Sequence, residues 1–197
     1  MMSLHAEMEQ ILEVAHTLSG LHADDFEALR AVADQAQAWA EELEAQIRAL
    51  LGEHEATRPY AETYLAGKPA AWFRSLFEVQ SEREFLYRQM DIAVEHVRHG
   101  VPNEVVLALA PRWVEWMTAK AAATLGYEKA QEIAVVMTRV LNLAAVVMVA
   151  TYDMVIRRTF IRETGFSEAL LKRLQTRTLQ EIADQMQDEQ TAAAAAA

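Results

Sequence analysis

Helix breakers are few in this sequence, and they separate long segments in which apolar residues have helical spacing. The 197 residues include only 6 glycines and 4 prolines. Because these two residues punctuate β-rich folds at short intervals, their scarcity favours helices. Between the breaks, apolar residues recur every three or four positions, which places them on one face of a helix. We therefore expect an all-α fold without strands.

The periodicity predicts seven or eight helices. The expected segments are 3–18, one that begins near Asp24 or Asp25, an apolar stripe over 43–51, one that begins near Pro59, one from Ser81 to Gly100, and then 104–124, 128–163 and 166–186. The second segment either continues through Leu43 or breaks near Asp34, and the spacing does not decide between the two. Thr57 before Pro59 predicts a helix start, and Ser81 followed by Glu84 is typical of a capping box.

A chain of this length suits one domain with an added terminal helix. We expect a domain over residues 1–165, because Gly165 follows the last strongly apolar segment. The polar amphipathic segment 166–187 is then a linker helix, and the alanine-rich tail 188–197 is expected to be disordered.

Charge and cysteine content exclude several classes of function. The formal net charge is −11, and the 18 basic residues are scattered. A chain this acidic repels nucleic acids and anionic membrane surfaces, so we expect neither as a partner. The absence of cysteine excludes disulfide scaffolds, thiolate zinc sites and thiol nucleophiles. No basic-then-apolar targeting pattern opens the sequence, and we expect a cytoplasmic protein.

The apolar run over residues 133–156 is the strongest hydrophobic feature. Arg139, Asn142 and Asp153 interrupt it, whereas a membrane-spanning helix needs about 20 consecutive apolar residues. We therefore expect a buried helix of a soluble protein. Its apolar residues cover most of the circumference, more than one core face uses, and this favours a homodimer.

Motifs for catalysis are missing, so we do not expect an enzyme. The sequence has no glycine-rich phosphate loop, nucleophile elbow or HExxH pair. Helical bundles that hold two irons use paired ExxH motifs, but that spacing occurs here once, from Glu13 to His16. His96 and His99, one helical turn apart, form a weaker candidate for joint chelation of one metal ion.

A more specific pattern surrounds His96. Residues 87–102 resemble the proximal-histidine region of globin-coupled sensors and protoglobins, whose pattern is His-x-Arg-x-Gly-Val/Ile-Pro. The residues that match in register are His96, Arg98, Gly100, Val101 and Pro102. His99 departs from the pattern, because isoleucine is usual there. The resemblance extends over about residues 20–165, but only residues 88–102 are specific.

This resemblance implies a globin-like fold that holds one haem b through His96. A five-coordinate haem needs one neutral imidazole, held on a helix beside a large apolar slot. Ile92 lies about one turn before His96 on the same helix face and is expected to pack against the porphyrin, as are Val101 and Phe77. The alternative is that His96 merely caps a helix end, where the helix dipole favours its charge.

On the distal side the chain departs from the resembled families. They commonly place a tyrosine on the second core helix, where Ile47 stands here, and Leu65 is the best match to a leucine from the next helix. Tyr64 or Tyr60 could replace the missing donor. Three states of the sixth iron position are open: an apolar pocket for carbon monoxide or nitric oxide, which we favour, a tyrosine-supported dioxygen site, or closure by His54 or Lys68.

The resemblance also implies a role in signalling. The domain would bind a diatomic gas (O2, CO or NO) and form a homodimer through its last two long helices. The C-terminal helix would relay the ligand state to an output domain, fused or separate. The alternative is a haem-free globin-like regulatory domain that binds a small apolar ligand or a protein partner.

Overall fold

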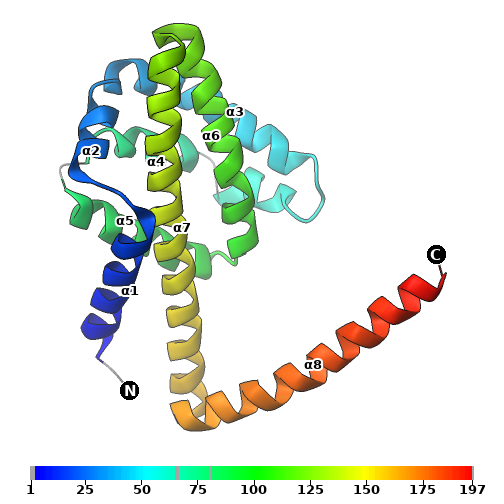
Figure 1. Ribbon diagram of the computed structural model, residues 1–197. Coiled ribbons are helices and arrows are strands. Elements are labelled where there is room, and N and C mark those ends of the chain that lie inside the picture. The colour runs from blue at the N-terminus through cyan, green and yellow to red at the C-terminus, as the bar shows by residue number, and fades with distance from the viewer. Residues whose placement is uncertain (1–2, 65–66, 80, 197) are drawn as a thin grey trace. The chain divides into compact units, whose positions relative to one another are not determined.

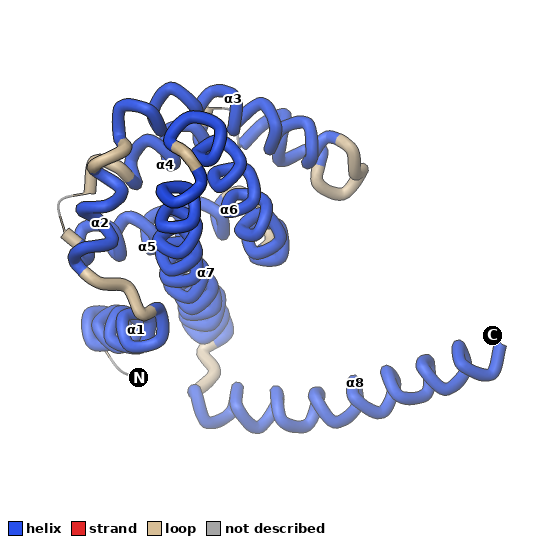
Figure 2. The backbone as a smooth tube through the Cα atoms, turned by 45° about the horizontal axis from the view of Figure 1, so that its top comes forward, coloured by secondary structure: helices blue, strands red, loops and turns tan. Residues whose placement is uncertain are grey.

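The computed structural model describes residues 3–64, 67–79 and 81–196. In these ranges the chain forms eight α-helices and one short π-helix, without a strand (Figures 1 and 2). The elements are α1 Leu4–Ser19, α2 Ala23–Arg30, α3 Ala33–Gly52, η1 Tyr60–Tyr64, α4 Lys68–Leu76, α5 Glu82–Arg98, α6 Asn103–Leu125, α7 Tyr127–Thr164 and α8 Glu168–Ala196. The prediction of an all-α, globin-like fold with a C-terminal helix is confirmed. The chain divides into two compact units, residues 2–153 and 154–197.

The break between α2 and α3 lies at Ala31 and Val32, just before Asp34, so the second predicted segment is two helices. The start of α2 differs slightly from expectation. Its N-cap is His22, and the Asp25 carboxylate accepts a hydrogen bond from the His22 backbone N–H at 2.8 Å. Asp25 therefore stabilises the helix start from within the first turn, where a negative charge also suits the helix dipole.

The predicted start of α5 is confirmed, whereas the helix expected from Pro59 differs. The Ser81 hydroxyl accepts a hydrogen bond from the Glu84 N–H at 3.2 Å and caps α5. After Pro59 the chain forms only the five-residue π-helix η1. The Thr57 hydroxyl donates to the Leu51 carbonyl at 2.6 Å, so it closes the end of α3 instead of opening the next helix.

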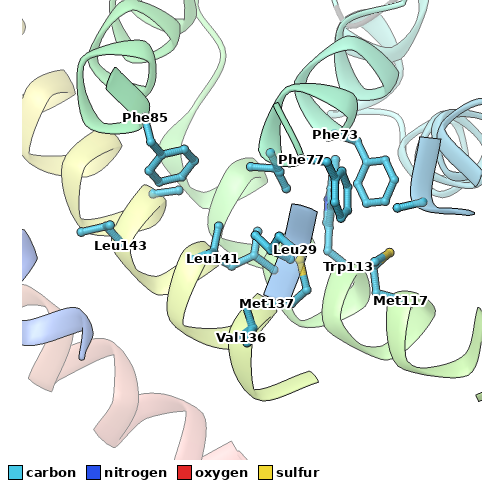
Figure 3. Close-up of a cluster of buried hydrophobic side chains, with 14 of the residues drawn as sticks. Leu29, Phe73, Phe77, Phe85, Trp113, Met117, Val136, Met137, Leu141 and Leu143 are labelled. Atoms are coloured by element: carbon cyan, nitrogen blue, oxygen red, sulfur yellow. The ribbon is translucent and has the colours of Figure 1, made fainter. Parts of the chain in front are cut away.

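A hydrophobic core fills the unit formed by residues 2–153. Figure 3 shows side chains from α4, α5, α6 and α7 gathered in it, among them Phe73, Phe77, Phe85, Trp113, Met137 and Leu143. The Phe73 and Phe77 rings lie edge to face with centroids 5.1 Å apart, and Phe26 packs in the same manner on Phe85 at 5.9 Å. Edge-to-face pairs of this kind add to the stabilisation that burial supplies.

Two buried carboxylates tie helices of this unit together. Asp25 of α2 accepts a hydrogen bond from Arg139 of α7, with 2.9 Å between Oδ1 and Nη1. Glu44 of α3 accepts from the backbone N–H groups of Gly67 at 2.7 Å and Ala70 at 3.3 Å. Because these two amides open α4, the Glu44 carboxylate holds the start of α4 against α3.

Among the described residues one helix, α7, is long and apolar enough to cross a membrane by length and composition alone. Half of its most apolar stretch is buried inside the protein, and core helices of soluble proteins meet the same criterion. The helix therefore gives weak grounds for a membrane location.

The C-terminal helix α8 follows the break at Gly165, whose φ is 70°. Its backbone remains helical to Ala196, so it includes residues 188–196, for which the sequence predicts disorder. Alanine has the highest intrinsic helix propensity, which accounts for helical backbone in this tail.

Replacement of Glu44 by alanine tests the junction between α3 and α4. The Gly67 and Ala70 amides lose a buried acceptor, so we expect the free energy of unfolding to fall by about 1–3 kcal/mol. Arg48, whose side chain is 52% exposed, pairs with the same carboxylate at 2.6 Å. Arg48→Ala is the matched control and should cost about 0.5 kcal/mol or less. Urea unfolding of both variants measures the difference, and equal losses would contradict this role of Glu44.

Candidate functional site

A cavity of about 480 Å³ lies within the unit formed by residues 2–153. Helices α3, α4, α5, α6 and α7 all contribute to its walls. The apolar residues in its lining include Ile47, Trp72, Ile92, Val101, Val105, Leu109, Trp113, Leu141 and Met148. A mostly apolar cavity of this size is typical of sites for small molecules and cofactors.

His96 lies in the wall of this cavity, in the last turn of α5. The residue is 8% exposed. Burial, together with the nearby positive charges of Lys68 and His99, lowers the pKa of His96 from 6.5 to about 4. The imidazole is therefore neutral at neutral pH, which is the form that can ligate a metal ion.

The end of α5 fixes where His96 lies. The Val101 N–H donates to the His96 carbonyl at 2.9 Å, and the Gly100 N–H donates to the Val97 carbonyl at 3.2 Å. Together with the φ of 65° at Gly100, these bonds form a Schellman motif. The motif brings Val101 back beside His96, so both residues line the cavity. The left-handed backbone that this motif requires explains why glycine stands at position 100.

Four of the predicted site residues line the same cavity: His96, Ile92, Val101 and Ile47. Phe77 is not among the lining residues, because it follows the end of α4 and its ring is buried against Phe73 in the core. The expected contact between Phe77 and a cofactor therefore has no support.

Of the residues predicted for the distal side, some lie outside the described part of the chain and others do not line the cavity. Leu65 lies outside the described residues, as does the side chain of Tyr64. Tyr60 is half-buried against the core and does not line the cavity. His54 is exposed, and its Nδ1 accepts a hydrogen bond from the Ala56 N–H at 3.2 Å. Of the two expected internal ligands, only Lys68 lines the cavity.

Sequence reasoning did not identify Trp72 of α4 or the individual α7 residues that line the cavity. Leu141, Ala144, Ala145 and Met148 line it from α7. Their spacing of three and four residues was visible in the sequence, and the two alanines leave room that larger side chains would fill. Trp72 lines it from α4, and no local signal marks that role.

The polar groups that α4 places at the cavity are hydrogen-bonded within the protein. The indole N–H of Trp72 donates to Gln89 Oε1 at 2.9 Å. The Ser75 hydroxyl donates to the Trp72 carbonyl at 2.6 Å. Gln89 is fully buried and also donates through Nε2 to the Phe85 carbonyl at 3.3 Å.

Charged side chains also contribute to the lining, and they come from α4 and α5. They are Lys68, Arg88, Asp91 and Glu95. Lys68 and Asp91 are exposed, so they belong to the margin where the cavity meets solvent. Arg88 forms an i,i+4 pair with Glu84 at 3.2 Å, a bond of the kind that contributes little at a surface. Lys68 and Arg88 thus bring two positive charges to the lining.

The described residues place one neutral imidazole beside the apolar cavity. Among the described residues, no group of three or more His, Asp or Glu side chains is arranged to hold a metal ion. His99 lies 3.6 Å from Glu95 on the exposed side of α5, and His16 bonds to Glu82 at 2.6 Å, so neither joins His96. Haem brings its own four nitrogen ligands and needs one neutral imidazole beside an apolar slot.

Comparisons with known proteins leave the family open: no protein-family model matches this sequence, and no curated protein is significantly similar to it.

The depressed pKa of His96 predicts loss of stability in acid. Between pH 6.5 and about 4 the unfolded chain binds a proton that the folded protein excludes. The free energy of unfolding therefore falls as the pH falls through this range, by on the order of 3 kcal/mol from this group. Urea unfolding at pH 7 and pH 4.5 measures this fall. Between these two pH values the free energy of unfolding should fall less in His96→Leu than in the wild type. His5→Leu, which removes an exposed imidazole of α1, is the control. If the free energy of unfolding falls as much in His96→Leu as in the wild type, His96 does not have a depressed pKa.

The Schellman motif predicts different effects of two glycine substitutions. Gly20 and Gly100 both have φ near 65° and end a helix. Alanine at either position should lower the free energy of unfolding by about 1–2 kcal/mol, because a Cβ strains left-handed backbone. Only Gly100→Ala should also raise the pKa of His96 toward 6.5, since the burial of that imidazole depends on the motif. NMR titration of the His96 ring measures this, and an unchanged pKa would argue against the coupling.

Proposed function

We propose that this chain is a haem-binding gas sensor domain of the globin-coupled sensor and protoglobin type, with haem b held through His96. One observation carries the proposal: a single neutral imidazole is buried in the wall of an apolar cavity of cofactor size. The motif around His96 and the all-α, globin-like fold support the same assignment.

In this proposal each group of lining residues has a distinct task. His96 would supply a nitrogen ligand to the iron without first losing a proton, because its pKa lies far below neutral pH. Ile92 and Val101 pack beside it, while the tryptophans and the α7 side chains exclude water. Lys68 and Arg88 would be the cationic side chains of the lining that face propionate carboxylates. When bound, haem supplies the iron at which a diatomic gas binds.

The proposed relay uses the helices that border the cavity. Residues of α6 and α7 line it directly, so a change in its occupancy reaches both long helices. Exposed apolar side chains on α6 and α7, including Leu107 and Val135, favour a homodimer through these two helices. We propose that α8 passes the ligand state to an output domain, fused or separate. We also propose that this protein is cytoplasmic and that residues 1–165 catalyse no reaction themselves.

The second candidate is a haem-free domain that binds a small apolar ligand. The apolar lining would hold a hydrocarbon group, and the Lys68 ammonium at the margin would donate to a carboxylate. This candidate needs no metal and gives no role to the neutral imidazole of His96, which is why we prefer haem.

An absorption spectrum separates the two candidates. We expect purified protein mixed with haem to develop a Soret band at one equivalent and to retain the haem through gel filtration. His96→Ala should lose the bound chromophore, or keep only a weak one with altered absorption, whereas His99→Ala should resemble the wild type. His99 is the matched control because it lies on the same helix with an exposed ring. Stoichiometric haem retention by His96→Ala, or none by the wild type, would reject the proposal.

A further inference from the structure

We propose that Gln89 is a specificity-determining residue: by engaging the indole N–H of Trp72, it withholds this donor from a gas held in the cavity. The expected effect is weaker retention of dioxygen relative to carbon monoxide. This inference rests on the proposed haem-binding function and extends it to the choice of gas.

The geometry of the Trp72–Gln89 pair supports this role. Trp72 belongs to α4 and lines the cavity, while Gln89 belongs to α5, two turns before His96. Trp72 Nε1 and Gln89 Oε1 are 2.9 Å apart, a normal distance for an N–H···O bond. The bond therefore directs the only polar atom of the Trp72 ring toward α5.

Gln89 is itself fixed in the orientation that this bond needs. Its Nε2 donates to the Phe85 carbonyl at 3.3 Å, one turn earlier in α5, which leaves Oε1 as the acceptor for Trp72. The residue is fully buried, at 0% exposure. A buried amide is costly unless it is hydrogen-bonded, so an apolar side chain would fill this position more simply. The presence of glutamine points to its bond with Trp72.

The ring of Trp72 is held from a second side by Trp113 of α6. The two rings lie edge to face with centroids 4.6 Å apart, and both line the cavity. The Ser75 hydroxyl, the other neutral donor that α4 places at the cavity, is engaged by the Trp72 carbonyl. Trp72 thus lines the ligand space, and its N–H is engaged by Gln89.

Hydrogen-bond donors in a haem pocket decide how strongly it retains dioxygen. Dioxygen becomes polarised on ferrous haem and accepts such a bond, whereas carbon monoxide does so much less. If Gln89 cannot accept, the Trp72 N–H is released next to the cavity. We expect dioxygen to dissociate about tenfold more slowly, the factor that corresponds to one net hydrogen bond of about 1.4 kcal/mol.

The test uses Gln89→Met, which keeps the length of the side chain but removes the amide, together with Trp72→Phe and the double variant. Gln89→Leu is a second variant in case Gln89→Met folds poorly. Dissociation rates of dioxygen and carbon monoxide are measured on the haem-loaded ferrous proteins. Ultraviolet resonance Raman spectra of the haem-free proteins, with Trp72→Phe as the reference, report the hydrogen bonding of the Trp72 indole.

We expect Gln89→Met to slow dioxygen dissociation about tenfold and to change carbon monoxide dissociation less than twofold. Trp72→Phe, which lacks the indole N–H, sets the reference rates for this pocket, and the double variant should have the dioxygen rate of Trp72→Phe. In haem-free protein, the Raman signal of a hydrogen-bonded indole should weaken in Gln89→Met.

An unchanged dioxygen rate in Gln89→Met, or a slowed rate that persists in the double variant, would overturn the inference while haem binding stands. A Raman signal unaffected by Gln89→Met would overturn it without any reference to haem. If no variant and no wild-type protein binds haem, the proposed function itself fails, and the Soret band distinguishes this outcome from the others.

Discussion

Burial of the neutral His96 imidazole beside an apolar cavity is the constraint on which the other features of the site depend. An imidazole with a pKa of about 4 gives up solvation that an exposed histidine would keep. The fold holds it there through the backbone bonds that end α5 at Gly100. A protein that needed only a helix cap at this point could use an exposed side chain, so the burial of His96 favours a ligand role over a capping role.

Three other buried polar side chains of the unit, Glu44, Asp25 and Gln89, join its helices. Glu44 holds the opening amides of α4 to α3, and Asp25 holds α2 to α7 through Arg139. Gln89 links α5 to α4 through Trp72. Removing one partner of such a buried contact leaves the other unsatisfied, which is why these few bonds fix the helix positions more strictly than apolar packing alone. The cavity thus has walls whose positions are set by specific contacts.

Features that depend on neighbouring residues, such as helix ends, can be predicted from the sequence. The helix boundaries at Ser81, Gly100, Gly126 and Gly165 follow from capping and from backbone conformation, and the structure places them as expected. His96, Val101 and Ile92 share a cavity because the end of α5 is a local motif. Contacts between distant segments could not be predicted. The Trp72–Gln89 bond and the packing of Phe77 into the core depend on how α4 docks on its neighbours, and the π-helix η1 replaces a predicted α-helix start.

We propose that the imidazole of His96 ligates the iron of haem. Resonance Raman spectroscopy of the ferrous, gas-free protein tests it most directly, because the bond between iron and imidazole gives its own stretching band. We expect this band in the wild type, its loss in His96→Gly, and its return when free imidazole is added to that variant. A band of unchanged frequency in His96→Gly without added imidazole would show that another residue ligates the iron, and His96 would not be the ligand.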